Sequence, residues 1–274
     1  MSELTQLTCI LGLRYATRGP ALDPAYGEDG VELCLDVLGP APLPDEPLPT
    51  VVRIDGCPGW MPGHRNAGIG PFANPLLAHA GFLTISVSVR HSRQAAFPAQ
   101  LQDIDDAVEW LRINSPGLPI DRDRMGIWGQ SAGGHIAALH ALTQRTVKAA
   151  VVICAPTDLL TAGGEMVNDA PSPITDLVGG TDREQLRRAS PITYVTPAAP
   201  PFLIIHGTRD ETVPFDQAER LDQALRKAGA ESRLLPIEGG YHNLRADPRP
   251  TDDGPVPHRA GDAVRDFFDR YLRS

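Results

Sequence analysis

The sequence predicts an α/β protein built on a mostly parallel sheet with helices on both faces. The first observation is a series of short apolar runs that are nearly continuous rather than alternating, as is typical of strands buried on both faces. The second is helical periodicity between those runs. The third is the length of 274 residues, which suits a single domain over 1–274.

Antiparallel strands are expected at one edge of this sheet, because the segments up to Asp55 have no helical connections. A proline cluster at 39–49 is typical of a surface turn between two of them. The later apolar runs predict strands buried in the sheet; they cover 82–89, 125–129, 149–155, 202–206 and 232–238.

Three helices follow from apolar residues that recur at spacings of three and four. A glycine after Lys227 predicts the end of the second helix. The apolar stripes are Leu101, Ile104, Val108 and Leu111; Ala218, Leu221 and Leu225; and Val264, Phe267, Phe268 and Tyr271.

Two stretches interrupt the alternation of strands and helices. Residues 157–200 form a long irregular insertion, and residues 243–258 are polar and rich in proline. Long loops in a compact α/β domain are functional lids or mobile surface. We expect 157–200 to be a partial cap, whereas for 243–258 a lid and a solvated loop are equally good interpretations.

Composition excludes some partners. The net charge of −9 repels phosphates, so nucleic acid and anionic membranes are not expected as main partners. The charge says little about a small neutral molecule, which is the partner we expect. The four cysteines show no C-x-x-C pair, and we expect neither a metal nor another cofactor. The N-terminal segment does not resemble a signal peptide, so we expect a cytoplasmic protein. The sequence leaves open whether the chain forms a homo-oligomer.

A candidate nucleophile lies where an apolar run changes into a helical pattern, at Gly129-Gln130-Ser131-Ala132-Gly133. A strand that turns sharply into a helix strains its corner residue and leaves no room for neighbouring Cβ atoms, which explains the glycines. The serine hydroxyl is then exposed beside N–H groups at a helix N-terminus. The alternative interpretation is an ordinary N-cap serine.

A serine nucleophile needs a base and an orienting acid. Downstream of Ser131, Asp210 follows the run at 202–206, and His242 follows the run at 232–238. The carboxyl ends of parallel strands meet at one sheet edge, so the three side chains are expected together, in the order Ser, Asp, His.

Rival residues were considered for both partners. Glu211 adjoins Asp210 and could be the acid, and His258 is the main rival base. Asp158 is interpreted as a turn or helix-start residue. His206 is interpreted as a hydrogen-bonded group, either of the core or in support of the catalytic residues.

A metal pair on the helical segment that follows Ser131 is not expected. His135 and His140 are five residues apart, which is about 500° around a helix, so they face different ways. We therefore assign neither histidine to a metal site.

With these residues in place, the chain resembles the α/β-hydrolase superfamily. It is most similar to serine esterases of the acetyl- and feruloyl-esterase type, related to the hormone-sensitive-lipase branch. The resemblance runs from about Tyr15 to the C-terminus and includes "IDRDRMGIWGQSAGGH", "HGTRDETVPF" and "GGYH". It implies an α/β-hydrolase fold with Ser131, Asp210 and His242 as nucleophile, acid and base.

The segment expected to complete the oxyanion hole departs from the family pattern. Such esterases have His-Gly-Gly-Gly-Trp there, whereas this chain has Asp55-Gly56-Cys57-Pro58-Gly59-Trp60. Proline has no N–H to donate. The expected donors are therefore the N–H group of Ala132 and that of Cys57, with Gly59 as the less favoured alternative to Cys57. Gly56 is assigned to the same oxyanion hole. Asp55 is the residue expected to alter substrate choice or weaken activity.

The sequence predicts hydrolysis of small to medium carboxylic esters through an acyl-enzyme. Substrate contacts are expected from Trp60, Gln130 and Tyr241, which flank the predicted site. Two alternatives remain: an arylformamidase or amidase on the same triad, and a catalytically weak scaffold that binds a ligand.

Overall fold

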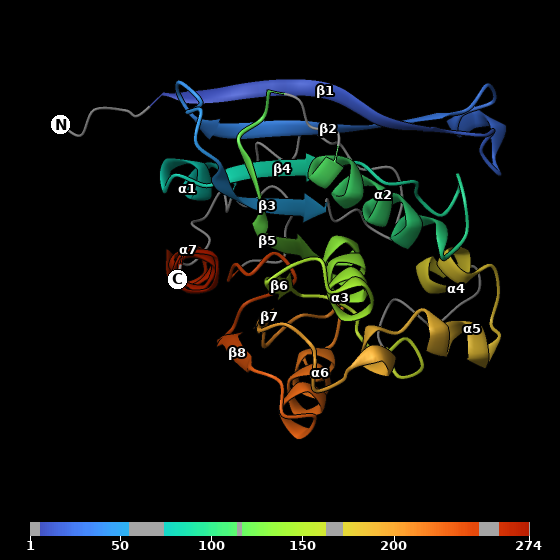
Figure 1. Ribbon diagram of the computed structural model, residues 1–274. Coiled ribbons are helices and arrows are strands. Elements are labelled where there is room, and N and C mark those ends of the chain that lie inside the picture. Colours follow the sequence, from blue (N-terminus) through green and yellow to red (C-terminus); the bar gives the residue numbers. More distant parts are fainter. Residues whose placement is uncertain (1–5, 55–73, 114–116, 163–171, 247–257, 274) are drawn as a thin grey trace.

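The structure, a computed structural model, describes residues 6–54, 74–113, 117–162, 172–246 and 258–273. These residues form one eight-stranded sheet in the order β1-β2-β4-β3-β5-β6-β7-β8 (Figure 1). The predicted α/β class is confirmed. The strands are β1 (Leu7–Arg18), β2 (Val31–Pro40), β3 (Leu48–Ile54), β4 (Leu83–Val87), β5 (Ile120–Gln130), β6 (Ala149–Ile153), β7 (Phe202–Gly207) and β8 (Ser232–Ile237).

The antiparallel part of the sheet is one edge. β1 pairs antiparallel with β2, and β2 antiparallel with β4, while every other pairing is parallel. For β1 and β2 the expected antiparallel edge is confirmed. For β3 it is wrong, because this strand lies between β4 and β5 and is parallel to both. The physical reason is the crossover through α1 (Asn74–His79), which returns the chain to the start of β4.

Helices cover both faces of the sheet (Figure 1). One apolar layer packs α2 (Ala99–Ile113), α3 (Ala132–Gln144) and α6 (Asp216–Lys227), and the other packs α1 and α7 (His258–Leu272). Successive strand residues alternate between the layers. Ile127 belongs to the first and Trp128 to the second. This two-sided burial is why the strands read as continuous apolar runs.

The predicted helical stripes lie against these layers. Ala218, Leu221 and Leu225 are buried on α6, and Gly229 follows the helix with φ of +82°, which a glycine adopts without strain. On α7, Phe268 packs so closely on the sheet that a Cβ at Gly126 would lie 2.6 Å from its ring. Within the described ranges, no helix is long and apolar enough to cross a membrane.

The insertion after β6 is tied to the core at both described ends. It contains α4 (Pro173–Val178), α5 (Arg183–Arg188) and the 3₁₀ turn η5 (Pro191–Tyr194). Phe97 N donates to the carbonyl of Leu177 at 2.7 Å, and Ile192 N to that of Thr157 at 3.1 Å. Residues 163–171 lie outside the described part, so its expected role as a partial cap stays a prediction.

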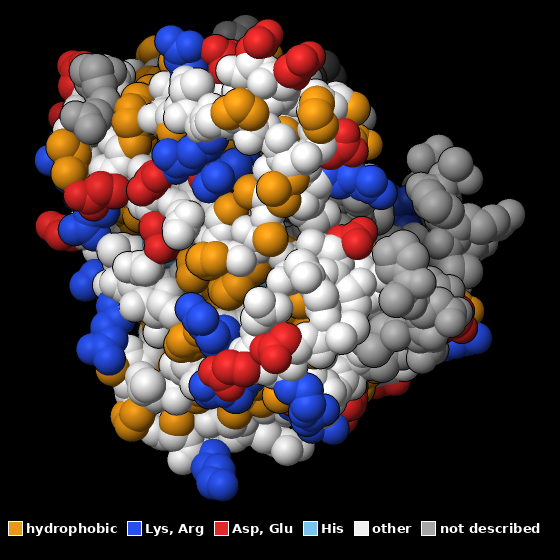
Figure 2. All heavy atoms as spheres, turned by 90° about the vertical axis from the view of Figure 1, so that its right-hand side faces the viewer, with side chains coloured by type: hydrophobic (Ala, Val, Ile, Leu, Met, Phe, Trp, Pro, Cys, Tyr) orange, Lys and Arg blue, Asp and Glu red, His pale blue; other side chains and the backbone are white. Residues whose placement is uncertain are grey.

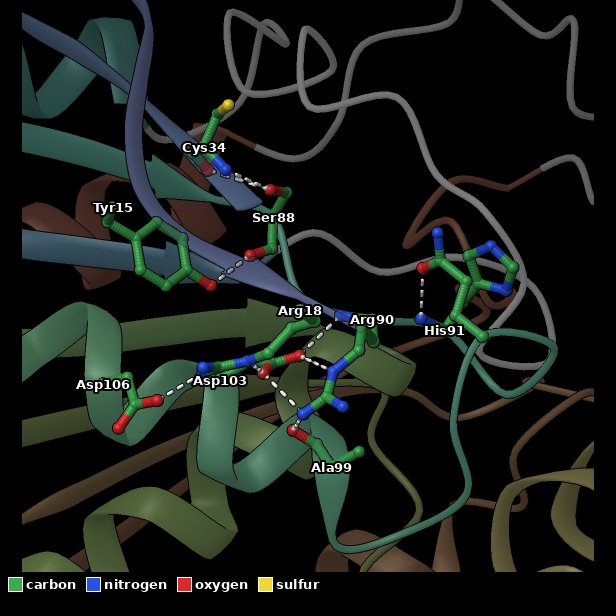
Figure 3. Close-up of polar contacts among 10 residues, drawn as sticks. Tyr15, Arg18, Cys34, Ser88, Arg90, His91, Ala99, Asp103 and Asp106 are labelled. Carbon is green, nitrogen blue, oxygen red and sulfur yellow. Dashed lines mark hydrogen bonds and ion pairs between the residues drawn. The ribbon is translucent and has the colours of Figure 1, made fainter. Parts of the chain in front are cut away.

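A buried carboxylate fastens the connection between β4 and α2 to the antiparallel edge (Figure 3). The side chain of Asp103 is fully buried and accepts from Arg90 and Arg18 at 2.8 to 2.9 Å. Nearby, the Tyr15 hydroxyl donates to the carbonyl of Ser88 at 2.7 Å. Buried charges are stable only when paired in this way. The contacts join β1, β4 and α2 near the carboxyl ends of the parallel strands.

Candidate active site

Ser131 forms the corner between β5 and α3. Its φ of 54° and ψ of −125° are strained for a residue with a Cβ. Two backbone hydrogen bonds hold the corner: Ser131 N donates to the carbonyl of Ile153 at 2.8 Å, and His135 N donates to the carbonyl of Ser131 at 3.0 Å. The serine therefore lies at the carboxyl edge of the sheet and at the N-terminus of a 13-residue helix.

Glycines make this corner sterically possible. A Cβ at Gly129 would lie 2.3 Å from the carbonyl carbon of Gly133, and one at Gly134 would lie 2.9 Å from Cβ of Ala155. Real Cβ atoms do not approach other atoms so closely. The predicted reason for the glycines, close packing of strand against helix, is confirmed.

His242 reaches Ser131 from β8, three strands away in the sheet. Its loop lies directly on Gly207, where a Cβ would be 2.2 Å from the carbonyl oxygen of Gly240. Arg209 N also donates to that oxygen at 2.9 Å. The loop is thereby carried back over β7, and His242 Nε2 lies 2.9 Å from Ser131 Oγ.

Asp210 lies just after β7 and completes the arrangement. Its Oδ2 is 2.8 Å from His242 Nδ1, and its Oδ1 accepts from the N–H groups of Thr212 and Val213 at 3.0 and 2.9 Å. Burial by itself would raise the pKa of Asp210, but the contacts from His206 and His242 outweigh burial and lower it below the ordinary value. The carboxylate is therefore ionised.

These contacts fix the direction of proton transfer. A carboxylate can only accept, so His242 donates through Nδ1, and Nε2 is left to accept from the Ser131 hydroxyl. The Asp210 side chain is fully buried, while the His242 side chain is 28% exposed. The arrangement can take a proton from a serine as that serine attacks an electrophile.

Of the other predicted site residues, the structure describes three. Ala132 is the first residue of α3 and is buried. Gln130 Nε2 donates to the backbone carbonyl of His242 at 3.1 Å. Tyr241 is half-buried, with the Arg209 guanidinium 4.9 Å from the centre of its ring. Predictions for Asp55, Gly56, Cys57, Pro58, Gly59 and Trp60 fall outside the described residues.

The rival residues lie elsewhere. Glu211 is exposed, and it is Asp210 that contacts the histidine. Asp158 accepts from the N–H of Leu160 at 3.2 Å, which confirms its interpretation as a turn residue. His258 begins α7, and its side chain lies outside the described part. His206 is fully buried and hydrogen-bonded to the carbonyl of Val213 at 2.9 Å, which confirms it as a bonded core group.

Two contacts of the acid were missed from the sequence. His206 Nε2 lies 3.2 Å from Asp210 Oδ2, and the spacing of four residues was the available signal. Cys154, at the end of β6 with φ of 47°, has its sulfur within 4.8 Å of ligand atoms of both Asp210 and His242. Burial first, and then the Asp210 charge, raise the pKa of the Cys154 thiol well above its ordinary value. A metal needs the thiolate, so this environment opposes metal binding.

The molecular surface at the carboxyl ends of the parallel strands carries both hydrophobic and charged side chains. Figure 2 looks at the right-hand side of Figure 1, toward which the arrow of β3 points. Hydrophobic side chains occupy its middle, and cationic and anionic side chains are interspersed around them.

The sequence profile of the BD-FAE family matches residues 35–225. Esterase LipQ of Mycobacterium tuberculosis is 31% identical over 79% of this chain and 55% of its own length, and esterase LipC of the same organism is 31% identical over 84% and 60%. The chain thus spans little more than half the length of these relatives.

Solved structures agree with the fold. A truncated carbohydrate esterase from gut microbiota superimposes with a TM-score of 0.80 at 25% identity, covering 100% of this chain and 99% of that one. Thermogutta terrifontis esterase 2, at 21% identity, gives 0.74 and covers 98% and 96%.

Proposed function

Since the chain belongs to the BD-FAE family, we propose that it hydrolyses small to medium carboxylic esters through an acyl-enzyme on Ser131. The observation that carries the proposal is the continuous relay from Asp210 through His242 to Ser131, with heavy-atom distances of 2.8 and 2.9 Å. The esterases LipQ and LipC support the same reaction class.

In the first half of the reaction, Ser131 Oγ attacks the ester carbonyl carbon while His242 Nε2 takes the hydroxyl proton. Asp210 holds the imidazole in the required tautomer and stabilises its charged form. The tetrahedral intermediate then loses the alcohol, which leaves with the proton from His242. Water repeats the sequence on the acyl-enzyme, and the carboxylic acid is released with Ser131 restored.

The developing oxyanion needs N–H donors. Ala132 supplies one at the N-terminus of α3, where the helix dipole also favours negative charge. The proposed second donor is Cys57, beside Gly56, and each donor contributes about 3 kcal/mol to transition-state stabilisation.

The proposed substrates are uncharged esters with short acyl chains. A face with hydrophobic side chains bordered by charges of both signs (Figure 2) suits such molecules better than a strongly charged ligand. The gut carbohydrate esterase, at 25% identity over the whole chain, adds carbohydrate esters to the panel. Trp60 and Tyr241 are the proposed substrate contacts.

The test is hydrolysis of p-nitrophenyl acetate and butyrate by the purified protein beside Ser131→Ala and His242→Ala. Breaking such a triad lowers kcat by a factor on the order of 10⁶, so both variants should fall to the background rate. Thr143→Ala on the far turns of α3 is the control and should match the wild type. A Ser131→Ala variant as active as the wild type would disprove the proposal, and formamides and amides would then be assayed.

A further inference from the structure

A second histidine contacts the same oxygen of the catalytic acid as His242. His206 is in β7, four residues before Asp210, and is fully buried. Its Nε2 lies 2.9 Å from the carbonyl oxygen of Val213 and 3.2 Å from Asp210 Oδ2. The Phe215 ring packs nearly perpendicular to it, with 5.8 Å between ring centres.

The contacts fix the tautomer of His206. Both neighbours of Nε2 are acceptors, so this nitrogen must carry the proton. In the part of the chain that the structure describes, Nδ1 has no hydrogen-bond partner. A proton there would add a buried donor without an acceptor, so the ring carries its single proton on Nε2.

This N–H closes a ring of contacts around the acid. Val213 donates its own N–H to Asp210 Oδ1 at 2.9 Å, and its carbonyl accepts from His206. The imidazole thus holds the backbone of Val213 in place and keeps a donor beside Oδ2. Both carboxylate oxygens are fixed, one directly by His206 and one through Val213.

We propose that His206 is a positioning residue that holds the Asp210 carboxylate in the orientation required by His242. The inference rests on the proposed function, since it assigns Asp210 to the acid role. A leucine would fill this apolar site without leaving a buried nitrogen unpartnered, so packing alone does not explain an imidazole. Hydrogen bonds from His206 and His242 both lower the pKa of Asp210, against the effect of burial, which agrees with this role.

The decisive comparison is His206→Gln against His206→Leu. The amide of glutamine places two N–H bonds near the position of Nε2 and can serve both Val213 and Asp210, whereas leucine of similar size serves neither. A shift of about 1 Å in a catalytic group costs about 100-fold in rate. We expect kcat to fall 10- to 100-fold in the leucine variant, with KM within about twofold of the wild type. The glutamine variant should recover most of the loss.

Each outcome decides the point. A folded leucine variant with wild-type kcat, or a glutamine variant as slow as the leucine variant, would overturn the proposal. If the leucine variant does not fold, ¹⁵N NMR of histidine-labelled wild type decides instead. A proton on Nε2 of His206 supports the proposal, and a proton on Nδ1 refutes it. A wild type without esterase activity would instead refute the proposed function, and the NMR measurement would still test the contact.

Discussion

A set of contacts from a carboxylate through an imidazole to a hydroxyl lies toward each end of α3, and the surroundings of the two sets differ. At its N-terminus, Asp210, His242 and Ser131 are linked at 2.8 and 2.9 Å. In the C-terminal half of α3, His140 Nδ1 is linked to Asp105 of α2 at 2.7 Å, and His140 Nε2 to Thr146 Oγ1, just beyond the helix, at 2.8 Å. A list of hydrogen bonds would describe both as carboxylate, imidazole and hydroxyl in a row.

Three differences separate the two sets. Ser131 has strained backbone geometry at the positive end of α3, whereas Thr146 lies beyond the negative end, where an oxyanion is disfavoured. His242 is 28% exposed and His140 only 1%. Asp210 is the fully buried member of its set, whereas Asp105 is 26% exposed. Position in the helix and access to the imidazole, rather than the hydrogen bonds, distinguish a catalytic set from a structural one.

A large difference in kcat should appear when each carboxylate becomes an amide. Asp210→Asn lets His242 adopt the wrong tautomer, and kcat should fall by a factor on the order of 10⁴. Asp105→Asn should leave kcat within about twofold of the wild type, because His140 reaches no substrate. Initial rates with p-nitrophenyl butyrate measure both. Equal losses in the two variants would remove the distinction.

Replacing the histidines should separate stability from activity. His140→Ala removes the buried partner of Asp105 and Thr146, and should lower the free energy of unfolding by about 2 to 3 kcal/mol while kcat of the folded protein is unchanged. His242→Ala should lower kcat to the background rate and leave the free energy of unfolding nearly unchanged, since the His242 side chain is partly exposed. Urea denaturation and initial rates with p-nitrophenyl butyrate give the two quantities. An inactive but fully stable His140→Ala would contradict the structural role.

The contacts of the acid with His206 and His242 also predict a pH effect. Asp210 has a pKa below its ordinary value, so the unfolded chain binds more protons than the folded one in acid, and stability rises with pH there. Its contribution is fully present above about pH 4 and is lost as pH falls through the lowered value. Urea denaturation between pH 5 and pH 2.5 should give a steeper fall for wild type than for Asp210→Asn. Parallel curves would show that the carboxylate is not stabilised by folding.

The difference between the two sets also marks what sequence could predict. Ser131, Asp210 and His242 each follow an apolar run, and parallel strands end at one edge, so their meeting could be predicted without side-chain detail. The contact of Asp105 with His140 depends on how α2 packs against α3, which periodicity leaves open.

Other elements were beyond sequence reasoning for related reasons. The place of β3 in the middle of the sheet depends on a crossover that residue pattern alone did not reveal. The contact of His206 with Asp210 depends on the turn at 210–213, in which two N–H groups fix the carboxylate. Long-range packing and turn geometry, rather than local propensity, decided both.

The smallest effect should come from two glutamines, one serving each set. Gln130 Nε2 donates to the backbone carbonyl of His242 at 3.1 Å, and Gln144 Nε2 donates to Asp105 Oδ2 at 2.8 Å. Because Gln130 immediately precedes Ser131, its hydrogen bond ties the loop of the base to the strand of the nucleophile. Gln130→Leu should therefore lower kcat about fivefold and leave KM unchanged, a loss of about 1 kcal/mol, which is the usual value of one such hydrogen bond.

Gln144→Leu is the matched control and should leave both constants at the wild-type values. Acetyl, butyryl and hexanoyl esters separate two roles for Gln130. A residue that positions His242 slows all three esters by the same factor, because every acyl transfer uses the same base. A residue that contacts substrate changes KM, and changes it differently with acyl length. A length-dependent KM in Gln130→Leu would therefore return Gln130 to the substrate pocket, where the sequence alone had placed it.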